Sequence, residues 1–495
     1  MPVTPPDGPN VILIVMDTAR SSTVFPASGP CVMPAVERIA NEGVRFDNTM
    51  ATGPWTVPSH ASMFTGLYTS DHGAHAGTKR FDPPFAPLAE QLAATGYRTA
   101  AFSNNTWLSP PFGFDRGFES FRTRWELFNG GKNLAAVAKA EGVKKKLGTL
   151  LTKLADKEAP LTIANFIYAV SLSFRTTKDS GAERTTNRII DWVNPNDGSP
   201  FFCFVNYVEP HLPYDPPGEI REKFLQGGVK NSVLDRVNQD PWAYLTRKAE
   251  MDSRDFEALR ALYKAELLYL DACIERLYKR LDQEGILNDT VIVVVGDHGE
   301  NIGEHGLMDH QYCLYNTLLH VPCVIRYPNA FTPGTHIKGL VELRDLFPTL
   351  LDLAGQSIPD HSGVSRNSLV RPTERSVQRE YAIAEYLSPQ PSIESLRRKV
   401  NGDLPESVEK FDRALRAIQT QNWKYIEGSD GEKELYDLSR DPEETENLVE
   451  ENPSTVKRFR ELLTSERGSF GSKTEATTAN VDTLTEKRLE DLGYI

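Results

Sequence analysis

The sequence lacks the features that mark several large classes of protein. Its five cysteines form no CxxC pair and are odd in number, which argues against both a disulfide framework and a thiolate zinc site. Acidic residues outnumber basic ones by 68 to 55, and the resulting net charge of −13 argues against a nucleic acid as a structural partner. No apolar run approaches ~18 residues, so no transmembrane helix is predicted.

The first ten residues, MPVTPPDGPN, contain neither a basic region nor an apolar core. They therefore do not resemble a signal peptide, and we expect a soluble, cytoplasmic protein. The apolar run VILIVM that follows is too short for a signal and suits a buried strand.

Three apolar runs, two of them rich in β-branched residues, predict the centre of the fold. They lie at 11–16, 201–208 and 290–297, and the second and third each follow a helical stretch. Strands that alternate with helices indicate an α/β protein with a large mixed, mostly parallel sheet flanked by helices. In such sheets functional side chains gather at the carboxyl ends of the strands.

The C-terminal part of the sequence has a different pattern. Short strand-like segments, YAIAEYL, NWKYIEG and KELYDL, follow one another with turn signals between them. We therefore predict a catalytic α/β domain at 1–372. A smaller C-terminal α+β subdomain with an antiparallel sheet and a polar tail is predicted at 373–495.

A basic helical insertion is predicted at about 126–180. Lys144, Lys145 and Lys146 precede an amphipathic stretch in this segment. The segment suits a solvated insertion, and the alternative is an element that contacts a membrane surface or a lipid substrate.

Polar side chains follow the three predicted strands. Asp17 follows the first, Glu209 and His211 follow the second, and the pair Asp297–His298 follows the third. Asp17 could cap a turn or bind a metal. Carboxylates combined with an imidazole suit Zn²⁺ or Mn²⁺, whereas carboxylates alone suit Ca²⁺ or Mg²⁺.

The peptide WTVPSHASMFTG contains three hydroxyl groups that could act as a nucleophile. Pro58 suits the first turn of a helix and Gly66 its end, which places Thr56 just before the helix. Free N–H groups there favour an anion, although Thr56 could also be a simple N-cap. Ser59 and Ser62 fall inside the helix, where hydroxyls usually bond to backbone carbonyls.

The sequence contains no GxSxG nucleophile elbow. Activation of Thr56 must then come from another source. A divalent ion held by Asp17, Asp297 and His298 would provide it, because a bound metal lowers the pKa of an oxygen ligand.

Five motifs occur in a family-specific order: NVILIVMD, TVPSHASMFTG, GDHGENIGEHG, VELRDLFPTLLDLAG, and NWKYIEG with ELYDLSRDPEETENL. In this order the chain resembles the sulfatase family of the alkaline phosphatase superfamily, over about 9–447 apart from the basic insertion. The resemblance implies an alkaline-phosphatase-like fold, a divalent metal ion (Zn, Mn, Ca or Mg), and hydrolysis or transfer of sulfate or phosphate esters.

The nucleophile peptide departs from the pattern of that family. The family carries C/S-x-P-x-R, whose Cys or Ser is oxidised to formylglycine, and the aligned residues here are Thr56, Pro58 and His60. Oxidation of a threonine would give a ketone and not the required aldehyde. The resemblance therefore implies that Thr56 acts unmodified, as in nucleotide phosphodiesterases and phosphoglycerol or phosphoethanolamine transferases.

Other positions depart from the family as well. Thr18 replaces the second Asp of an Asp-Asp pair, and the Lys-x-His sulfate clamp appears as Asn104 and Thr106. His211 matches a histidine that contacts the ester or leaving group, and His310 falls where many members have lysine. A single Asp at the first site also resembles phosphonate and phosphodiester hydrolases of the superfamily.

These observations predict a metal-dependent hydrolase of phosphate monoesters, phosphate diesters or phosphonates with an anionic ester substrate. The alternatives are a sulfatase, a phosphoryl-group transferase and an inactive anion-binding homologue. An alternative with two metals uses His211, His310 and an acid such as Glu209 for the second ion. The predicted catalytic residues are Thr56, His60, Asn104, His211 and His310, and the predicted metal ligands are Asp17, Thr56, Asp297 and His298.

Overall fold

The computed structural model describes residues 8–125, 180–193, 198–225, 231–370, 379–400, 404–470 and 485. The predicted basic insertion, with its lysine cluster and its proposed membrane contact, lies outside these residues except for its last position. The predicted domain boundary at 372 and almost all of the polar tail also lie outside them. Within the described part of the chain, no helix is both long enough and apolar enough to span a membrane.

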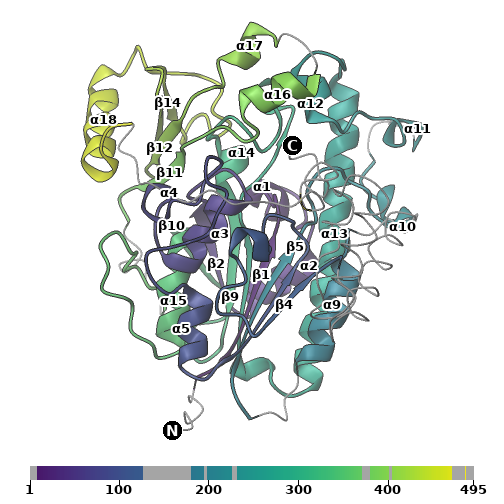
Figure 1. The fold of residues 1–495 in the computed structure, drawn as a ribbon. Coiled ribbons are helices and arrows are strands. Elements are labelled where there is room, and N and C mark those ends of the chain that lie inside the picture. The colour runs from purple at the N-terminus through teal and green to yellow at the C-terminus, as the bar shows by residue number, and fades with distance from the viewer. Residues whose placement is uncertain are drawn as a thin grey trace, which may run out of the picture.

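An eight-stranded sheet forms the centre of the molecule (Figure 1). Its strands, in spatial order, are β10 (Thr335–Glu342), β2 (Val44–Met50), β9 (His320–Arg326), β6 (Thr290–Gly296), β1 (Asn10–Met16), β5 (Phe201–Tyr207), β3 (Arg98–Ser103) and β4 (Ser120–Thr123). Neighbouring strands are parallel except where β9 pairs with β2 and with β6. The predicted fold class, a mixed and mostly parallel sheet, is confirmed.

Helices cover both faces of this sheet, which explains why its central strands are apolar throughout. One face packs against α13 (Ser253–Gln283), α9 (Ala182–Trp192) and α2 (Pro34–Asn41), and the other packs against α3 (Thr56–Thr65), α5 (Leu88–Ala94) and α15 (Leu346–Leu353). Along β1, alternate side chains enter the two cores: Leu13 packs in one, and Ile12 and Ile14 pack in the other. The cysteines in these cores are free thiols.

The described residues form further α-helices. They are α1 (Ser21–Val24), α4 (Thr69–His72), α10 (Gly218–Arg221), α11 (Asn231–Leu234), α12 (Pro241–Leu245), α14 (Asn316–Leu319), α16 (Ile393–Val400), α17 (Glu406–Glu409) and α18 (Pro453–Arg467). A short hairpin of β7 (Asn301–Ile302) and β8 (Met308–Asp309) follows β6 and forms a separate two-stranded sheet.

The predicted C-terminal sheet is present as four antiparallel strands. These are β11 (Ala382–Tyr386), β12 (Leu415–Gln419), β13 (Trp423–Gly428) and β14 (Lys433–Asp437). The three segments predicted as strands correspond to β11, β13 and β14, and β12 lies between the first two in the sheet. Phe459 and Leu463 of α18 pack on this sheet.

A buried carboxylate joins the two sheets. Glu342, at the end of β10, accepts hydrogen bonds from the Tyr68 hydroxyl and from the backbone N–H of Ile383 in β11, both at 2.8 Å. Arg344 and Arg379 form ion pairs with the same carboxylate. Burial would raise the pKa of Glu342, but the two guanidinium groups hold it below its usual range. Glu342 therefore remains charged where the sheets meet.

This joint makes a testable contribution to stability. Replacing Arg379 by methionine leaves the buried Glu342 carboxylate with one guanidinium instead of two, and we expect the free energy of unfolding to fall by about 3 kcal/mol. The matched control is Arg366→Met, because Arg366 pairs with Asp360 in an exposed position, where the loss should stay below about 1 kcal/mol. Thermal and denaturant unfolding of the two variants measure the difference, and equal losses would contradict the role of the joint.

Candidate functional site

The carboxyl ends of four neighbouring parallel strands, β6, β1, β5 and β3, form the floor of the site. The last residue of β1, Met16, pairs with Gly296 of β6, so Asp17 and Asp297 follow on adjacent strands. Thr18 then adopts a positive φ of 62°, an uncommon conformation for a β-branched residue. Its carbonyl accepts the Tyr263 hydroxyl at 2.8 Å, and its N–H donates to Asp297 Oδ1 at 3.2 Å. Thr18 thus supports the site through its backbone.

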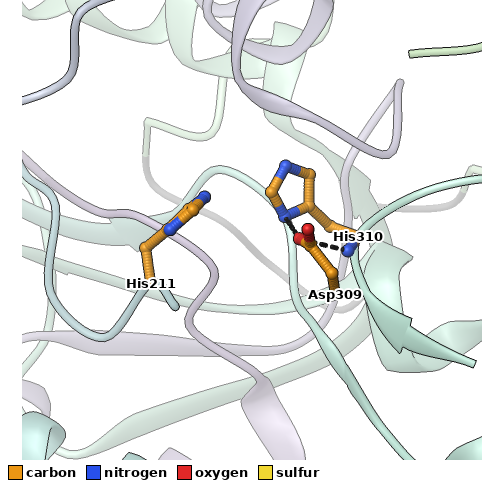
Figure 2. A group of neighbouring side chains, drawn as sticks. All are labelled: His211, Asp309 and His310. Atoms are coloured by element: carbon orange, nitrogen blue, oxygen red, sulfur yellow. Dashed lines mark hydrogen bonds and ion pairs between the residues drawn. The ribbon is translucent and has the colours of Figure 1, made fainter. Parts of the chain in front are cut away.

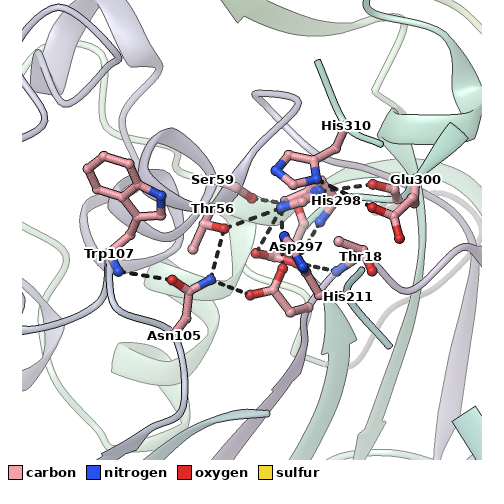
Figure 3. A network of polar contacts seen from close by, with 12 residues as sticks. Thr18, Thr56, Ser59, Asn105, Trp107, His211, Asp297, His298, Glu300 and His310 are labelled. Atoms are coloured by element: carbon pink, nitrogen blue, oxygen red, sulfur yellow. Dashed lines mark hydrogen bonds and ion pairs between the residues drawn. The ribbon is translucent and has the colours of Figure 1, made fainter. Parts of the chain in front are cut away.

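Asp17, Asp297 and His298 form a compact cluster of candidate metal ligands. Figure 3 labels Asp297 and His298 of this cluster. One ligand atom from each lies within 4.8 Å of the others, and all three residues are fully buried. His298 Nε2 lies 3.6 Å from Asp17 Oδ1 and 3.4 Å from Asp297 Oδ2. Because His298 Nδ1 lies 2.9 Å from the Gly299 carbonyl and must donate to it, Nε2 presents a lone pair to the cluster.

The electrostatics of this cluster fit a cation. Within the described part of the chain, Asp17 Oδ1 and Asp297 Oδ2 accept no hydrogen bond although both are buried. Burial raises the pKa of Asp17, and burial together with the Asp17 charge raises that of Asp297 well above its usual range. Burial lowers the pKa of His298. Two carboxylates and a neutral imidazole in this arrangement are the donor set expected for a divalent metal ion.

Thr56 is the first residue of α3. The prediction that it lies just before the helix was therefore wrong. The helix begins two residues ahead of Pro58, with Trp55 in extended conformation at its N-cap. Thr56 Oγ1 makes no capping bond and faces the metal cluster, 3.4 Å from His298 Nε2. Ser59 Oγ instead donates to the Asp297 carbonyl at 2.6 Å. Of these two hydroxyls, only that of Thr56 contacts the imidazole of the candidate metal cluster.

The structure brings Asn105, and not the predicted Asn104, to Thr56. Asn105 Nδ2 lies 2.6 Å from Asp17 Oδ2 and 3.3 Å from Thr56 Oγ1. Its Oδ1 accepts the backbone N–H of Trp107 at 2.9 Å, which fixes the orientation of the amide. Asn104 Oδ1 accepts the Thr185 hydroxyl of α9 at 2.8 Å, so this side chain is engaged with the neighbouring helix.

His60 lies beneath the nucleophile and carries no charge. Its Nδ1 donates to the Thr56 carbonyl at 2.8 Å and lies 3.5 Å from Asp297 Oδ2. Burial lowers the pKa of His60 to about 3, and its ring packs edge-on against Phe64 and Phe204. The position that holds arginine in the family pattern therefore supplies a neutral, packed ring that supports α3.

His211, Asp309 and His310 form a second cluster of candidate metal ligands (Figure 2). One ligand atom of each residue lies within 4.8 Å of those of the other two. The ring centroids of His211 and His310 are 5.0 Å apart. The ring of His298 lies 4.6 Å from that of His310, so the two clusters are adjacent. The structure thus brings the predicted His211 and His310 to the metal cluster.

The acid of this second cluster is Asp309. Asp309 Oδ1 accepts the backbone N–H of His310 at 2.7 Å and also contacts Nδ1 of that ring. Glu209, the acid suggested by the sequence, accepts the N–H of Ala182 at the start of α9 through Oε1, 3.0 Å away. Glu300 adds a further carboxylate, with Oε1 3.5 Å from His310 Nδ1.

The carboxylates around His310 determine its protonation. Burial would lower the pKa of His310, but Asp309 and Glu300 raise it to about 10. Burial would raise the pKa of Asp309, yet its contact with His310 holds it below the usual range. Burial raises the pKa of Glu300. In the absence of a cation, His310 is therefore an imidazolium ion at neutral pH.

Comparisons with known proteins give a consistent family. A family model described as sulfatase matches residues 9–356. Arylsulfatase K of Bos taurus is 24% identical over 93% of this chain and 82% of its own length. The multifunctional alkaline phosphatase superfamily protein PehA of Trinickia caryophylli is 25% identical over 89% of this chain and 91% of its own.

A solved structure extends the likeness to the fold. The phosphonate monoester hydrolase of Agrobacterium radiobacter superposes with a TM-score of 0.67 at 22% sequence identity, and covers 93% of this chain and 95% of its own. The family model spans well over half of the sequence and includes Asp17, Thr56 and the Asp297–His298 pair. The chain therefore belongs to the sulfatase family, and the prediction of a sulfatase-family ester hydrolase, acting on phosphoric or sulfuric esters, is confirmed at that level.

Proposed function

We propose that this chain is a divalent-metal-dependent hydrolase of phosphate or phosphonate esters that uses unmodified Thr56 as its nucleophile. The observation that carries the proposal is the position of Thr56 Oγ1, which lies 3.4 Å from His298 Nε2 and 3.3 Å from Asn105 Nδ2. A buried hydroxyl in that position serves no capping function in α3. Its place beside a set of candidate metal ligands suits covalent catalysis.

The residues present fit the metal that the family implies. Asp17, Asp297, His298 and Thr56 would hold the ion, and the mixed oxygen and nitrogen donors favour Zn²⁺ or Mn²⁺. When bound, a divalent ion at this position would lower the pKa of a hydroxyl ligand and offset negative charge on the ester. Asn105 would hold the hydroxyl of Thr56 and the Asp17 carboxylate in a fixed relative position.

The proposed reaction has two steps. In the first, the hydroxyl of Thr56 loses its proton to solvent and Oγ1 attacks phosphorus in line with the ester bond. A phosphothreonine forms, the bond from phosphorus to the alcohol oxygen breaks, and the alcohol leaves with a proton donated by His310. In the second, the now neutral His310 takes a proton from water, and the resulting hydroxide attacks phosphorus of the phosphothreonine. The phosphate or phosphonate product leaves, and Oγ1 of Thr56 is reprotonated by solvent. His211 lies beside His310 and would contact an oxygen of the ester or of the leaving alcohol.

Phosphorus is preferred over sulfur because of the chemistry of threonine. Formylglycine forms a hydrate that can expel sulfate by itself, whereas a threonine ester must wait for attack by water. The second candidate, a sulfatase, is favoured by the names of relatives such as arylsulfatase K. Transfer to an alcohol in place of water, and an inactive anion-binding homologue, are the remaining alternatives.

A substrate panel tests the choice between phosphorus and sulfur. Aryl phosphate monoester, aryl phosphate diester, aryl phosphonate and aryl sulfate, each with the same leaving group, are compared with protein loaded with Zn²⁺ or Mn²⁺. We expect kcat/KM to be higher for at least one phosphorus ester than for the sulfate. A higher kcat/KM for the sulfate would favour the sulfatase, and turnover of none of the four would favour the inactive homologue.

Replacement of the nucleophile provides the sharpest test. Thr56→Ala removes the attacking oxygen and should lower turnover on the order of 10³-fold or more, whereas Thr56→Ser keeps that oxygen and a measurable rate. Ser62→Ala is the control, because Ser62 contacts His72 and not the cluster, and it should keep the wild-type rate. Acid quench with a labelled phosphate ester should trap phosphate on Thr56, and a label on Ser59 or a fully active Thr56→Ala variant would refute the assignment.

The two adjacent asparagines form a matched pair of variants. Asn105→Ala removes the donor to Thr56 Oγ1 and should reduce kcat by about 10²-fold, the loss typical of a single positioned donor. Asn104→Ala removes only the bond with Thr185 and should reduce kcat far less. Steady-state kinetics at matched folded fraction, checked by thermal unfolding, compare the two. A larger loss of kcat in Asn104→Ala would restore the sequence-based choice of Asn104.

A further inference from the structure

The second cluster has the composition of a metal site in its own right. We propose that His211, Asp309 and His310 bind a second divalent cation beside the one assigned to Asp17, Asp297 and His298. Two imidazoles and one carboxylate are a donor set suited to Zn²⁺ or Mn²⁺ and poorly suited to Ca²⁺ or Mg²⁺, which prefer oxygen ligands. The proposal rests on the proposed function only in that it takes the first site as a metal site.

The ligand atoms of this second site converge from two separate segments. His211 lies on the loop after β5, and Asp309 and His310 lie at the end of the β7–β8 hairpin. All three are at least 95% buried, and their ligand atoms lie within 4.8 Å of one another. Figure 2 shows the Asp309 carboxylate against the His310 ring, with the His211 ring to one side of this pair. A cation between them would take the place of the direct contact between His310 and Asp309, and it would then stabilise the leaving oxygen in place of a proton from His310.

The hairpin holds its two ligands in a preformed arrangement. Asn301 of β7 pairs with Asp309 of β8, and Asn301 Nδ2 donates to the Asp309 carbonyl at 3.1 Å. Thr317 in turn donates to Asn301 Oδ1 at 2.6 Å. Asp309 itself has a positive φ of 73°, which turns its carboxylate toward His310 with help from the amide of Gln311 at 2.7 Å. Such external support is typical of metal ligands.

Glu300 provides the group that orients His310. It is fully buried, its Oε2 accepts the Tyr214 hydroxyl at 2.5 Å, and its Oε1 lies 3.5 Å from His310 Nδ1. A carboxylate beside a ligating imidazole is the common second partner of metal-bound histidine. We assign Glu300 as a positioning residue of this site and not as a ligand.

Charge balance is the independent argument for a second cation. Asp17, Asp297, Glu300 and Asp309 are all buried at this edge of the sheet, and their ion-pair partners among the described residues are histidines. One divalent ion offers only two positive charges to these four acidic groups. An anionic ester then adds further negative charge to a buried site, which is costly without another cation. A second divalent ion supplies it.

The consequence for chemistry is a two-metal centre. In such centres the ions lie about 3.5–4 Å apart and stabilise the attacking and leaving oxygens of an in-line displacement. The first site contacts the attacking Thr56 Oγ1 through His298, and the second lies beside it, because the rings of His298 and His310 are 4.6 Å apart. This arrangement favours a phosphate ester, whose displacement places charge on both of these oxygens.

Metal stoichiometry tests the proposal directly. The full-length protein is stripped with chelator, reloaded with excess Zn²⁺, passed through gel filtration and analysed for zinc by mass spectrometry. We expect about two equivalents in the wild type, about one in Asp309→Asn and in Asp297→Asn, and almost none in the double variant. Glu209→Gln is the matched control and should retain both equivalents, because this buried carboxylate is bonded to the start of α9.

The outcomes separate the two sites. If the wild type binds one equivalent of zinc, and Asp297→Asn loses it while Asp309→Asn keeps it, the second site is overturned. The proposed function then stands, with His310 as an imidazolium. Loss of one equivalent from Asp309→Asn while Asp297→Asn keeps two supports the second site and overturns the first, and with it the proposed function. If Asp309→Asn unfolds, as judged by circular dichroism, His211→Gln replaces it with the same expected loss, because His211 lies outside the hairpin. Retention of two equivalents in the folded variant refutes the proposal.

Discussion

The site depends on the electrostatic repulsion between two buried carboxylates, with which no lysine or arginine among the described residues forms an ion pair. Asp17 and Asp297 lie at the ends of adjacent strands β1 and β6, with Oδ1 of one and Oδ2 of the other buried without hydrogen bonds from the described residues. In a low dielectric, two such charges cost several kcal/mol unless a cation or protons compensate them. The hydrogen bonds to their remaining oxygens, from Asn105 and from the backbone of Thr18 and His298, fix them in this position. The site is thus preorganised to receive positive charge.

The same principle explains how this chain departs from the family pattern. Where that pattern has arginine or lysine, the chain has His60, Asn104 and His310. His60 is neutral because burial lowers its pKa, and Asn104 is bonded to Thr185. His310 alone carries a charge, and two carboxylates sustain it. Two of these three positions therefore carry no charge, and under the proposed function a bound metal would have to compensate the charge of an anionic ester more than in the family pattern.

Much of the fold and of the candidate site could be predicted from the sequence, because the sequence shows where the central strands end. Apolar runs located β1, β5 and β6, and the parallel arrangement of those strands brings Asp17, His211 and Asp297 to one edge. The choice between Asn104 and Asn105 could not be made, because it depends on which way each side chain leaves the end of β3. The motif located the amide donor to within one residue. The contact of Asn104 with Thr185 and that of Asn105 with Asp17 determine that Asn105 is the donor.

Asp309 was missed for a related reason. The DHGENIGEHGLMDH segment marks His298 and His310 by residue type, but the aspartate between them looks like an ordinary turn residue. Only the pairing of β7 with β8, and the positive φ that follows from it, turn its carboxylate toward the imidazole. Such a hairpin of two-residue strands has no periodic signal that could be recognised in advance.

The position of β6 in the sheet also bears on how the protein is made. Strand β6 pairs with β1 on one side and with β9 on the other, and Asn10 of β1 contacts Thr290 across 280 residues of sequence. During synthesis, the edge of β1 that pairs with β6 therefore stays unpaired until β6 has left the ribosome. Exposed strand edges of this kind associate with other chains, so a nascent polypeptide of this topology needs protection over most of its translation. The site residues are assembled only at the end of that interval.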